Sequence, residues 1–520
     1  MPQAYSKILL REWPLGFVFG CILFMLSPMF HADFGMIDDH EIVSILGRDK
    51  IVQTSEILPL IGEYAIEHNG RFRPAYYVLR ILEAYFVGGN PVLWYANRLL
   101  LALLSALFLY LGLRVFLRPL FAGLVTLLFF AGAQNEIWTR LGPQESYGVP
   151  LMLAGLAWVA VQLGRHNWHP ARLFPGLALL AVAGFLKESF IPVLPGALAF
   201  IYVVLPIVRR SIFEGPRRLK LVDIFALAFL TVSLAAQVWL TVRALRDYSH
   251  QYAADVSTTS FLYALKPMLL AYSRDNLWFV PLIAGFATLL PVSRQQWLEH
   301  GWRKELAAVI TLSATGVFLI LGPQSMVYGG DIIFEGRYLT PGNLFVVFTA
   351  ALGFYLLANH SKREHMELRG FITGMLLSVA LVKVFHTHAD ANVAVLSTHK
   401  FQAKITEIVQ LKTQYPELPL LFCSTNVFDR EPIVSTARFL AAKMPKLERP
   451  FLEPFAWEKQ ADSPRTPKLA RIMREESLEG DRSFAKIADF HGDNGRCIAV
   501  IFTNVAGNCP CEHTVRALGT

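Results

Sequence analysis

The stretch FHADFGMIDDHEIVSILGRDK, residues 30–50, decides how this chain can fold. An apolar run from Pro14 to Phe30 leads into it. The run closes on Asp33, and Asp38, Asp39, His40 and Glu41 then follow. Ionisable side chains at a bilayer boundary are costly unless they face water, a partner or a substrate. We therefore interpret residues 31–92 as the first outer loop of a membrane protein and the acidic motif as its candidate site.

The composition supports a membrane protein. Of the 520 residues, 54% are hydrophobic and only 17% are charged. The formal net charge of +8 comes from Lys and Arg that lie mostly in short loops between apolar runs, which is the positive-inside pattern. We therefore expect the lipid bilayer as a partner and expect no nucleic acid.

Apolar runs predict about eleven membrane spans, several of them short enough to require tilting or a re-entrant path. The predicted spans are Pro14–Phe30, Trp94–Leu113, Leu120–Ala133, Tyr147–Leu163, Leu173–Leu186, Phe190–Val208, Leu221–Val242, Leu277–Val292, Leu306–Leu321, Leu344–Ala358 and Phe371–Val384. With the N-terminus inside, alternate loops carry the excess of Lys and Arg. This orientation places the acidic motif, Lys187, Arg337 and the C-terminal region on the outer face. It predicts a multi-pass protein of the plasma (inner) membrane.

The predicted fold is mainly α: residues 1–386 form a polytopic transmembrane helical domain, and residues 387–520 form a small extracytoplasmic α/β domain. Polar residues return after Val384, where two strand-like runs alternate with helical patterns. The strand-like runs are Pro419–Ser424 and Arg496–Phe502, and the helical patterns are Ala403–Leu411 and Pro432–Met444. In the outer loop, Glu41–Arg48 and Tyr76–Phe86 predict amphipathic helices with their charges opposite the apolar face, lying along the membrane interface.

Four of the five cysteines fall in the C-terminal region, at positions 423, 497, 509 and 511. An exported domain would hold them as disulfides. The pair Cys509 and Cys511 is too close for a C-x-x-C redox motif, so we expect disulfides to Cys423 or Cys497 instead.

The acidic motif suggests chemistry. A carboxylate near the membrane surface can act as a general base on a hydroxyl or bind a divalent ion, and a second carboxylate can orient the first. Asp38 and Asp39 are the candidate catalytic residues, with His40 and Glu41 in the same pocket. The alternative is that Asp38-x-x-Glu41 is a variant capping box at a helix start.

Two further sites carry cations at the outer face. Lys187 beside Glu188 could meet an anionic phosphate, or it could form an internal ion pair or snorkel to the interface. Arg337 offers a planar fork for phosphate oxygens with Tyr338 as an interfacial anchor, or the two belong to an ordinary interfacial belt.

The polar loop QNEIWTRLGPQE, residues 134–145, is a candidate pocket wall through Arg140 and Glu145, or a solvated turn. His386, His388 and Asp390 resemble metal ligands, but nothing near them in sequence completes a site. The sequence therefore does not decide whether a divalent metal ion is required, and no other cofactor is indicated. No phosphate-binding glycine loop of the G-x-x-x-x-G-K-[ST] type is present.

Taken together, the outer acidic pair, Lys187-Glu188 and Arg337-Tyr338 resemble the layout of the GT-C superfamily of integral-membrane glycosyltransferases. The similar group includes the protein O-mannosyltransferases and the aminoarabinose transferases of lipid A. The resemblance covers about Pro14 to Val384. It implies transfer of a sugar from a polyprenyl-phosphate-linked donor to a hydroxyl of a glycan, lipid or protein on the extracytoplasmic side. By this resemblance Asp38 or Asp39 would be the base, and Lys187 and Arg337 would hold the lipid phosphate.

Two other classes stay open. A transporter or flippase of a lipid or polysaccharide precursor would place ionisable groups near the midplane and often shows repeated halves, neither of which the sequence indicates. A non-catalytic assembly protein would tolerate replacement of Asp38 and Asp39.

Overall fold

The computed structural model describes part of the 520-residue chain. The described residues are 12–36, 39–47, 50–67, 73–115, 117–132, 135–163, 170–191, 193–194, 196, 221–247, 337, 340, 343–344, 366–423, 430–444, 451–452, 496–502, 511 and 513–516. This part is mostly helical, and its strands are few and short. Asp38 and Tyr338 lie outside the described residues.

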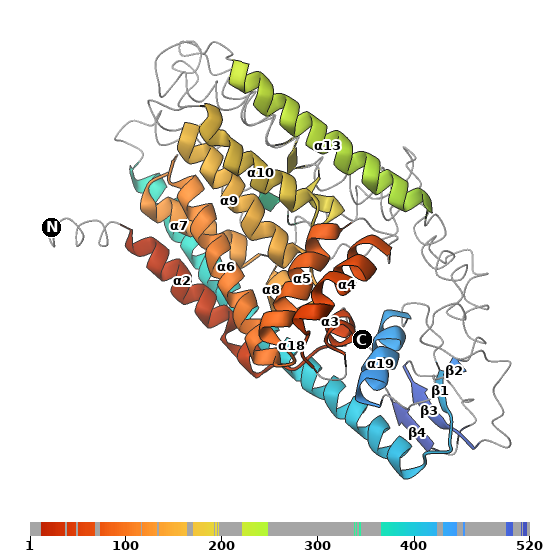
Figure 1. Cartoon of the computed structure of the whole chain (residues 1–520). Helices are drawn as coiled ribbons and strands as arrows, with labels where there is room; N and C mark the ends of the chain where they lie inside the picture. The colour runs from red at the N-terminus through yellow and green to blue at the C-terminus, as the bar shows by residue number, and fades with distance from the viewer. Residues whose placement is uncertain are drawn as a thin grey trace, which may run out of the picture.

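The centre of the structure is a group of apolar helices that pack side by side (Figure 1). It contains α2 (Trp13–Leu26), α6 (Pro91–Leu113), α7 (Pro119–Phe130) and α9 (Glu145–Leu163). Helix α6 packs along α9, while α2 packs on α7 and α6. Each of α2, α6 and α7 has a proline in its first turn, where the missing N–H costs no hydrogen bond.

Helices α10 (Phe174–Gly184) and α13 (Leu221–Asp247) extend this group beyond α9. The backbones of α9 and α10 touch at two glycines. A Cβ atom on Gly155 would lie 2.7 Å from the carbonyl oxygen of Gly176, and a Cβ on Gly176 would lie 2.9 Å from that of Gly155. Small residues that allow such close approach are typical of helix packing in membranes.

By length and apolar composition, two helical stretches among the described residues could cross a bilayer, Trp13–His31 and Pro91–Leu113. Shorter apolar helices occupy Pro119–Phe130, Phe174–Gly184 and Ala228–Arg243. These five match predicted spans, and α9 matches a sixth. The predicted spans Leu277–Val292 and Leu306–Leu321 lie outside the described residues. The number of about eleven spans is therefore not confirmed.

Residues 31–92, predicted to be the first outer loop, contain helices α3 (Asp39–Leu46) and α5 (Pro74–Val87), as expected. These are joined through α4 (Ile57–Ile61) and a π-helix at Gly62–Glu67. The prediction that the charged side chains of α5 lie opposite its buried apolar face is wrong. Arg80 and Glu83 point inward, while Phe86 is 78% exposed. The charged side chains can be buried because they pair with one another and with other polar groups.

A single helix, α18 (Met366–Gln414), runs through both segments predicted as separate helices and through the predicted domain boundary at residue 386. The predicted span Phe371–Val384 and the helix Ala403–Leu411 both lie within it. No proline or glycine occurs between Gly374 and Pro416, so nothing in the sequence interrupts the helix where the composition changes. The division at residue 386 is therefore not a break in the chain path.

The two predicted strands are present as β1 (Leu420–Cys423) and β3 (Ile498–Ile501). With β2 (Phe451–Leu452) and β4 (His513–Arg516) they form a parallel sheet of order β2-β1-β3-β4. A disulfide joins Cys497 to Cys511, as the cysteine pattern allowed, and Cys423 is also disulfide-bonded.

The C-terminal unit packs against the segment 31–92. Helix α19 (Arg430–Lys443), which matches the predicted Pro432–Met444, contacts α3 (Figure 1). Phe34, Met36 and Val43 of the loop pack on the hydrophobic cluster that α18, α19 and the sheet share. The helix that carries the acidic motif is thus held between the apolar helices and the C-terminal unit.

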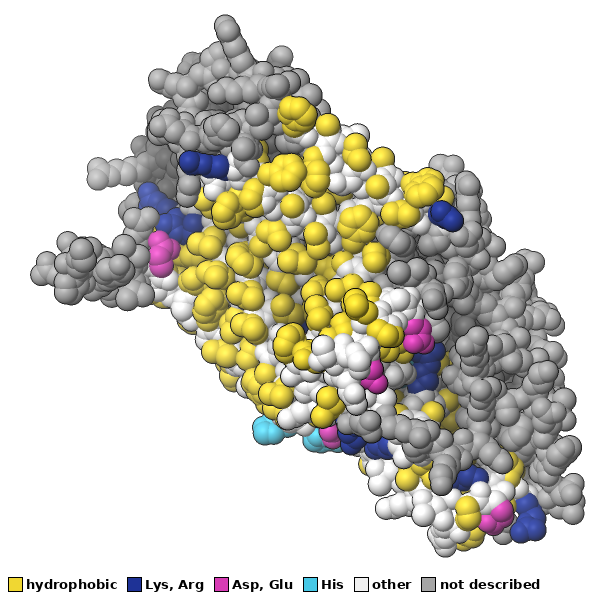
Figure 2. All heavy atoms as spheres, viewed as in Figure 1, with side chains coloured by type: hydrophobic (Ala, Val, Ile, Leu, Met, Phe, Trp, Pro, Cys, Tyr) yellow, Lys and Arg dark blue, Asp and Glu magenta, His cyan; other side chains and the backbone are white. Residues whose placement is uncertain are grey.

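Hydrophobic side chains cover much of one face of the molecule, over α2, α6, α10 and α13, with charged side chains toward its ends (Figure 2). Large apolar side chains that are more than half exposed include Trp13, Leu58, Phe86, Leu100, Phe225, Val232 and Trp239. A contiguous apolar face of this kind needs a lipid or protein partner.

Candidate functional site

Asp39 lies in the first turn of α3, where the helix N-terminus favours a carboxylate. It is only 2% exposed, and its Oδ2 accepts a 2.6 Å hydrogen bond from the backbone N–H of Gly35. Tyr95 of α6 lies within electrostatic reach of Asp39, Asp33 and Arg140. Asp39 is therefore fixed inside the molecule rather than displayed on a solvated loop.

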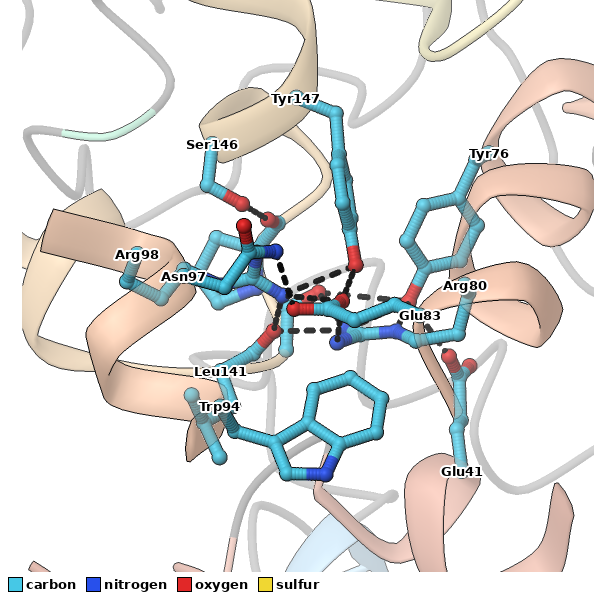
Figure 3. A network of polar contacts seen from close by, with 12 residues as sticks. Glu41, Tyr76, Arg80, Glu83, Trp94, Asn97, Arg98, Leu141, Ser146 and Tyr147 are labelled. Atoms are coloured by element: carbon cyan, nitrogen blue, oxygen red, sulfur yellow. Dashed lines mark hydrogen bonds and ion pairs between the residues drawn. The ribbon is translucent and has the colours of Figure 1, made fainter. Parts of the chain in front are cut away.

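Glu41, one of the candidate pocket residues, is half-buried and meets α5. The hydroxyl of Tyr76 donates to its Oε2 at 2.9 Å (Figure 3). Arg80 in turn donates to the Tyr76 oxygen from Nε at 3.2 Å and from Nη2 at 2.9 Å. Glu41 is thereby linked to a buried guanidinium through one tyrosine.

The network continues from α5 to α6 and α9 around the carboxylate of Glu83 (Figure 3). Glu83 accepts from Asn97 at 2.6 Å, from Arg98 at 3.1 Å and from the hydroxyl of Tyr147. Its Oε2 also lies 3.8 Å from Nη1 of Arg80. Both arginines are fully buried, and the Glu83 carboxylate offsets one of their two positive charges; Glu41 also acts on Arg80.

The predicted polar loop closes the network with its backbone. The carbonyl oxygen of Leu141 accepts from Arg80 at 2.6 Å and from Arg98 at 3.2 Å, and that of Gly142 accepts from Arg80 at 3.1 Å. The loop thus lines a buried polar region, but through carbonyls rather than through Arg140. Arg140 instead pairs with Glu136 at 2.6 Å near the surface.

Lys187 is buried and forms an ion pair with Glu145 at the start of α9. The sequence pointed to its neighbour Glu188, whose side chain lies outside the described residues. Burial lowers the pKa of Lys187 to about 8; Glu145 opposes this shift, and Arg73 and Arg337 add to it. Lys187 is therefore within electrostatic reach of Arg337 and of Arg73.

The two parts of the site meet through aromatic packing. Tyr76 and Tyr147 lie with ring centroids 6.1 Å apart and form one buried cluster with Leu186, the residue before Lys187. The acidic turn of α3 is connected to this cluster through Glu41. His40, also buried, completes the turn.

The C-terminal unit also contributes charge near the motif. Burial raises the pKa of Tyr64 to about 12, with Glu63 and Glu41 acting in the same direction and Arg438 of α19 against it. Tyr64 is therefore within electrostatic reach of both Glu41 and a residue of the C-terminal unit.

Sequence reasoning missed the buried network of Tyr76, Arg80, Glu83, Arg98 and Tyr147. The signal was present: Arg80 and Glu83 interrupt the apolar run VLRILEAYF, and Arg98 interrupts an apolar span. A charge inside an apolar helix is expected to face the protein interior with a partner.

Within the described residues, no group of three or more His, Cys, Asp or Glu side chains has the arrangement of a metal site. His386 bonds Asp390 at 3.1 Å, and His388 bonds the carbonyl oxygen of Phe24. These contacts account for the histidines as helix-surface groups.

Comparison with protein-family models, with curated proteins and with solved structures finds no match to this chain.

Proposed function

We propose that this chain is an integral-membrane glycosyltransferase of the GT-C type. It would move a sugar from a polyprenyl-phosphate-linked donor to a hydroxyl of a glycan, lipid or protein. The acidic motif and the C-terminal unit would face the extracytoplasmic side of the plasma (inner) membrane, and the helical part would be polytopic with about eleven spans.

The exposed apolar face supports a membrane setting. Its large side chains come from helices far apart in the sequence, including α2, α6 and α13. Leu58 and Phe86 of the outer loop, both 78% exposed, would lie at the lipid interface beside the site. A lipid-linked donor could then reach the site from the side without leaving the bilayer.

The observation that carries the proposal is the concentration of cations around Lys187. Two guanidiniums, Arg73 and Arg337, and one carboxylate, Glu145, act on its buried ammonium. A phosphate brings negative charge and several acceptor oxygens, which such a group can bind through charge-assisted hydrogen bonds. In the transfer, these cations would stabilise the charge that develops on the departing lipid phosphate.

The acidic turn would supply the base. Asp38 or Asp39 would accept the proton of the substrate hydroxyl as its oxygen attacks the anomeric carbon. The bond from that carbon to the phosphate oxygen breaks with inversion, and the polyprenyl phosphate leaves with the electron pair. His40 and Glu41 would complete the pocket for the hydroxyl-bearing substrate.

Binding of the lipid phosphate tests the proposal. The protein in lipid nanodiscs is titrated with polyprenyl phosphate, with Lys187→Gln and Arg337→Gln as variants and Glu136→Gln as a surface-charge control. Loss of one charge-assisted contact should weaken binding roughly 10-fold to 100-fold. Equal affinity of all four proteins would refute the phosphate role.

A transporter or flippase of a lipid or polysaccharide precursor is the second candidate, because the same cations would serve a phosphate headgroup that is moved rather than cleaved. A flippase would exchange labelled lipid between leaflets without releasing sugar. Release of polyprenyl phosphate together with a glycosylated product supports the transferase and excludes this alternative.

A further inference from the structure

We propose that Glu145 is an exchangeable counter-ion of Lys187, and that a lipid phosphate which reaches the ammonium replaces the Glu145 carboxylate there. The inference rests on the proposed function, in which Lys187 binds that phosphate, and deepens it. It assigns to Glu145 the control of how tightly the site holds a phosphate.

The ion pair between these two side chains is buried. Lys187 is 5% exposed and Glu145 is fully buried, and Nζ of Lys187 donates to Oε1 of Glu145. Glu145 lies in the first turn of α9, and Lys187 follows α10, so the packing of these two helices brings the pair together. A phosphate that binds this ammonium has to displace the carboxylate or share the ammonium with it. Sharing would place two anions side by side among buried groups, which is unfavourable.

Glu145 is held less firmly than Glu83, the carboxylate at the centre of the buried polar network. Glu83 accepts hydrogen bonds from three side chains of α6 and α9. Glu145 accepts from Lys187, and its Oε2 is buried with no donor in the part of the chain that the structure describes. An ionised carboxylate can accept several hydrogen bonds on each oxygen. Glu145 therefore has few bonds to lose when it leaves the ammonium, which suits a counter-ion that exchanges.

The charges around Lys187 favour a phosphate over the carboxylate. Arg73, at the start of α5, and Arg337 both act electrostatically on the ammonium. A phosphate monoester carries about two negative charges and several acceptor oxygens, so it can bond an ammonium and a guanidinium at the same time. Glu145 brings one negative charge, and its bond to Lys187 uses one oxygen. The exchange therefore replaces a weaker anion by a stronger one.

Glu145 has a second effect on Lys187, because it helps to keep the ammonium protonated. The charged groups that act on Lys187 most strongly are Glu145 on α9, Arg73 before α5 and Arg337. Burial lowers the pKa of Lys187 to about 8, and among these groups only Glu145 opposes that shift. Without the carboxylate the pKa would be lower still, so the lysine would lose its proton at a lower pH. Glu145 thus competes with a phosphate for the ammonium and also preserves the charge that the phosphate needs.

The test measures the affinity of polyprenyl phosphate for wild type and for Glu145→Gln, both in lipid nanodiscs, between about pH 5.5 and about pH 9. At the lowest pH, where Lys187 is charged in both proteins, the variant should bind about 10-fold more tightly, because no carboxylate competes for the ammonium. The affinity of the variant should then decline at a pH about one unit or more below that of wild type. Its advantage should therefore shrink as pH rises. The lipid is the same for both proteins, so titration of its own phosphate affects both curves equally.

Ser146→Ala is the matched control. Ser146 follows Glu145 in the first turn of α9, and its hydroxyl donates to the carbonyl oxygen of Pro143 at 2.8 Å. This variant disturbs the same turn without changing a charge, so its affinity should follow that of wild type within about twofold at each pH. Glu145→Asp replaces Glu145→Gln if the latter does not fold. Its shorter carboxylate pairs less closely with Lys187, so it should bind about 3-fold more tightly than wild type at the lowest pH, and no gain would count equally against the exchange.

Equal or weaker binding by Glu145→Gln at the lowest pH would overturn the exchange, and so would an equal gain in the Ser146 control. An unchanged pH of decline would overturn the role of Glu145 in keeping Lys187 protonated. If wild type binds no polyprenyl phosphate at any pH, the proposed function fails, and the exchange fails with it. If wild type binds the lipid and the Glu145 variant gains nothing, the exchange alone fails and the proposed function stands.

Discussion

Replacement of Glu83 by glutamine should be among the most damaging single-atom changes available in this chain. The Glu83 carboxylate accepts from Asn97, Arg98 and Tyr147 and lies 3.8 Å from Nη1 of Arg80. With Glu41 it balances the two buried guanidiniums, so Glu83→Gln leaves one positive charge uncompensated among fully buried side chains. Removing one partner of a buried ion pair costs about 3–5 kcal/mol.

The free energy of unfolding can be read from SDS titration of the protein in detergent micelles. Glu136→Gln is the control, because Glu136 pairs with Arg140 near the surface and its loss should cost less than about 1 kcal/mol. The double variant Glu83→Gln/Arg98→Met should cost less than the sum of its single variants, by about 1–3 kcal/mol. A Glu83 variant as stable as the Glu136 control would refute the account of the network.

Three further outcomes are expected. Because burial lowers the pKa of Lys187 to about 8, the rate of the proposed transfer should decline as pH rises through that value, where the ammonium loses its proton. The Lys187→Arg variant should move the decline to higher pH. An identical pH profile of this variant and wild type would refute phosphate binding by Lys187. Replacing Cys497 and Cys511 by serine should destabilise the C-terminal unit by about 2–4 kcal/mol, seen as a lower Tm of that unit, because the closed loop no longer restricts the unfolded chain. Gly155→Val should lower the free energy of unfolding, measured by SDS titration, by about 1–3 kcal/mol, because its side chain would meet the carbonyl oxygen of Gly176. Gly16→Val is the control and should lower it by less than about 1 kcal/mol, because nothing lies within 4 Å of a Cβ there.

The sequence was informative where a local pattern, such as an apolar run or a strand-like run, is enough to locate a helix or strand. Apolar runs located α2 and α6 within a few residues, and the strand patterns located β1 and β3. The sequence was less informative about helix length. The apolar span Phe371–Val384 and the pattern Ala403–Leu411 predict two helices, but helix formation continues through the polar residues between them because no glycine or proline stops it, giving the single helix α18.

For the site, it was easier to infer from the sequence which residues carry charge than which residues they pair with. The sequence placed Lys187 and Arg337 on one face, and the structure brings them within electrostatic reach. It left open an internal ion pair for Lys187, which lies beside Glu188 in the sequence; the ion pair forms with Glu145, 42 positions away. Such contacts depend on how α9 and α10 pack, which periodicity does not specify. The charged side chains of α5 were placed opposite its apolar face for the same reason: their partners lie on α6 and α9.

The central claim is that the acidic turn carries out glycosyl transfer. The most direct test supplies proteoliposomes with polyprenyl-phosphate-linked sugars and measures product from wild type, Asp38→Asn, Asp39→Asn and the double variant, with Glu136→Gln as control. The account predicts that at least one single variant and the double variant lose about 100-fold or more of the rate, while binding of polyprenyl phosphate persists. Full activity of the double variant would contradict it.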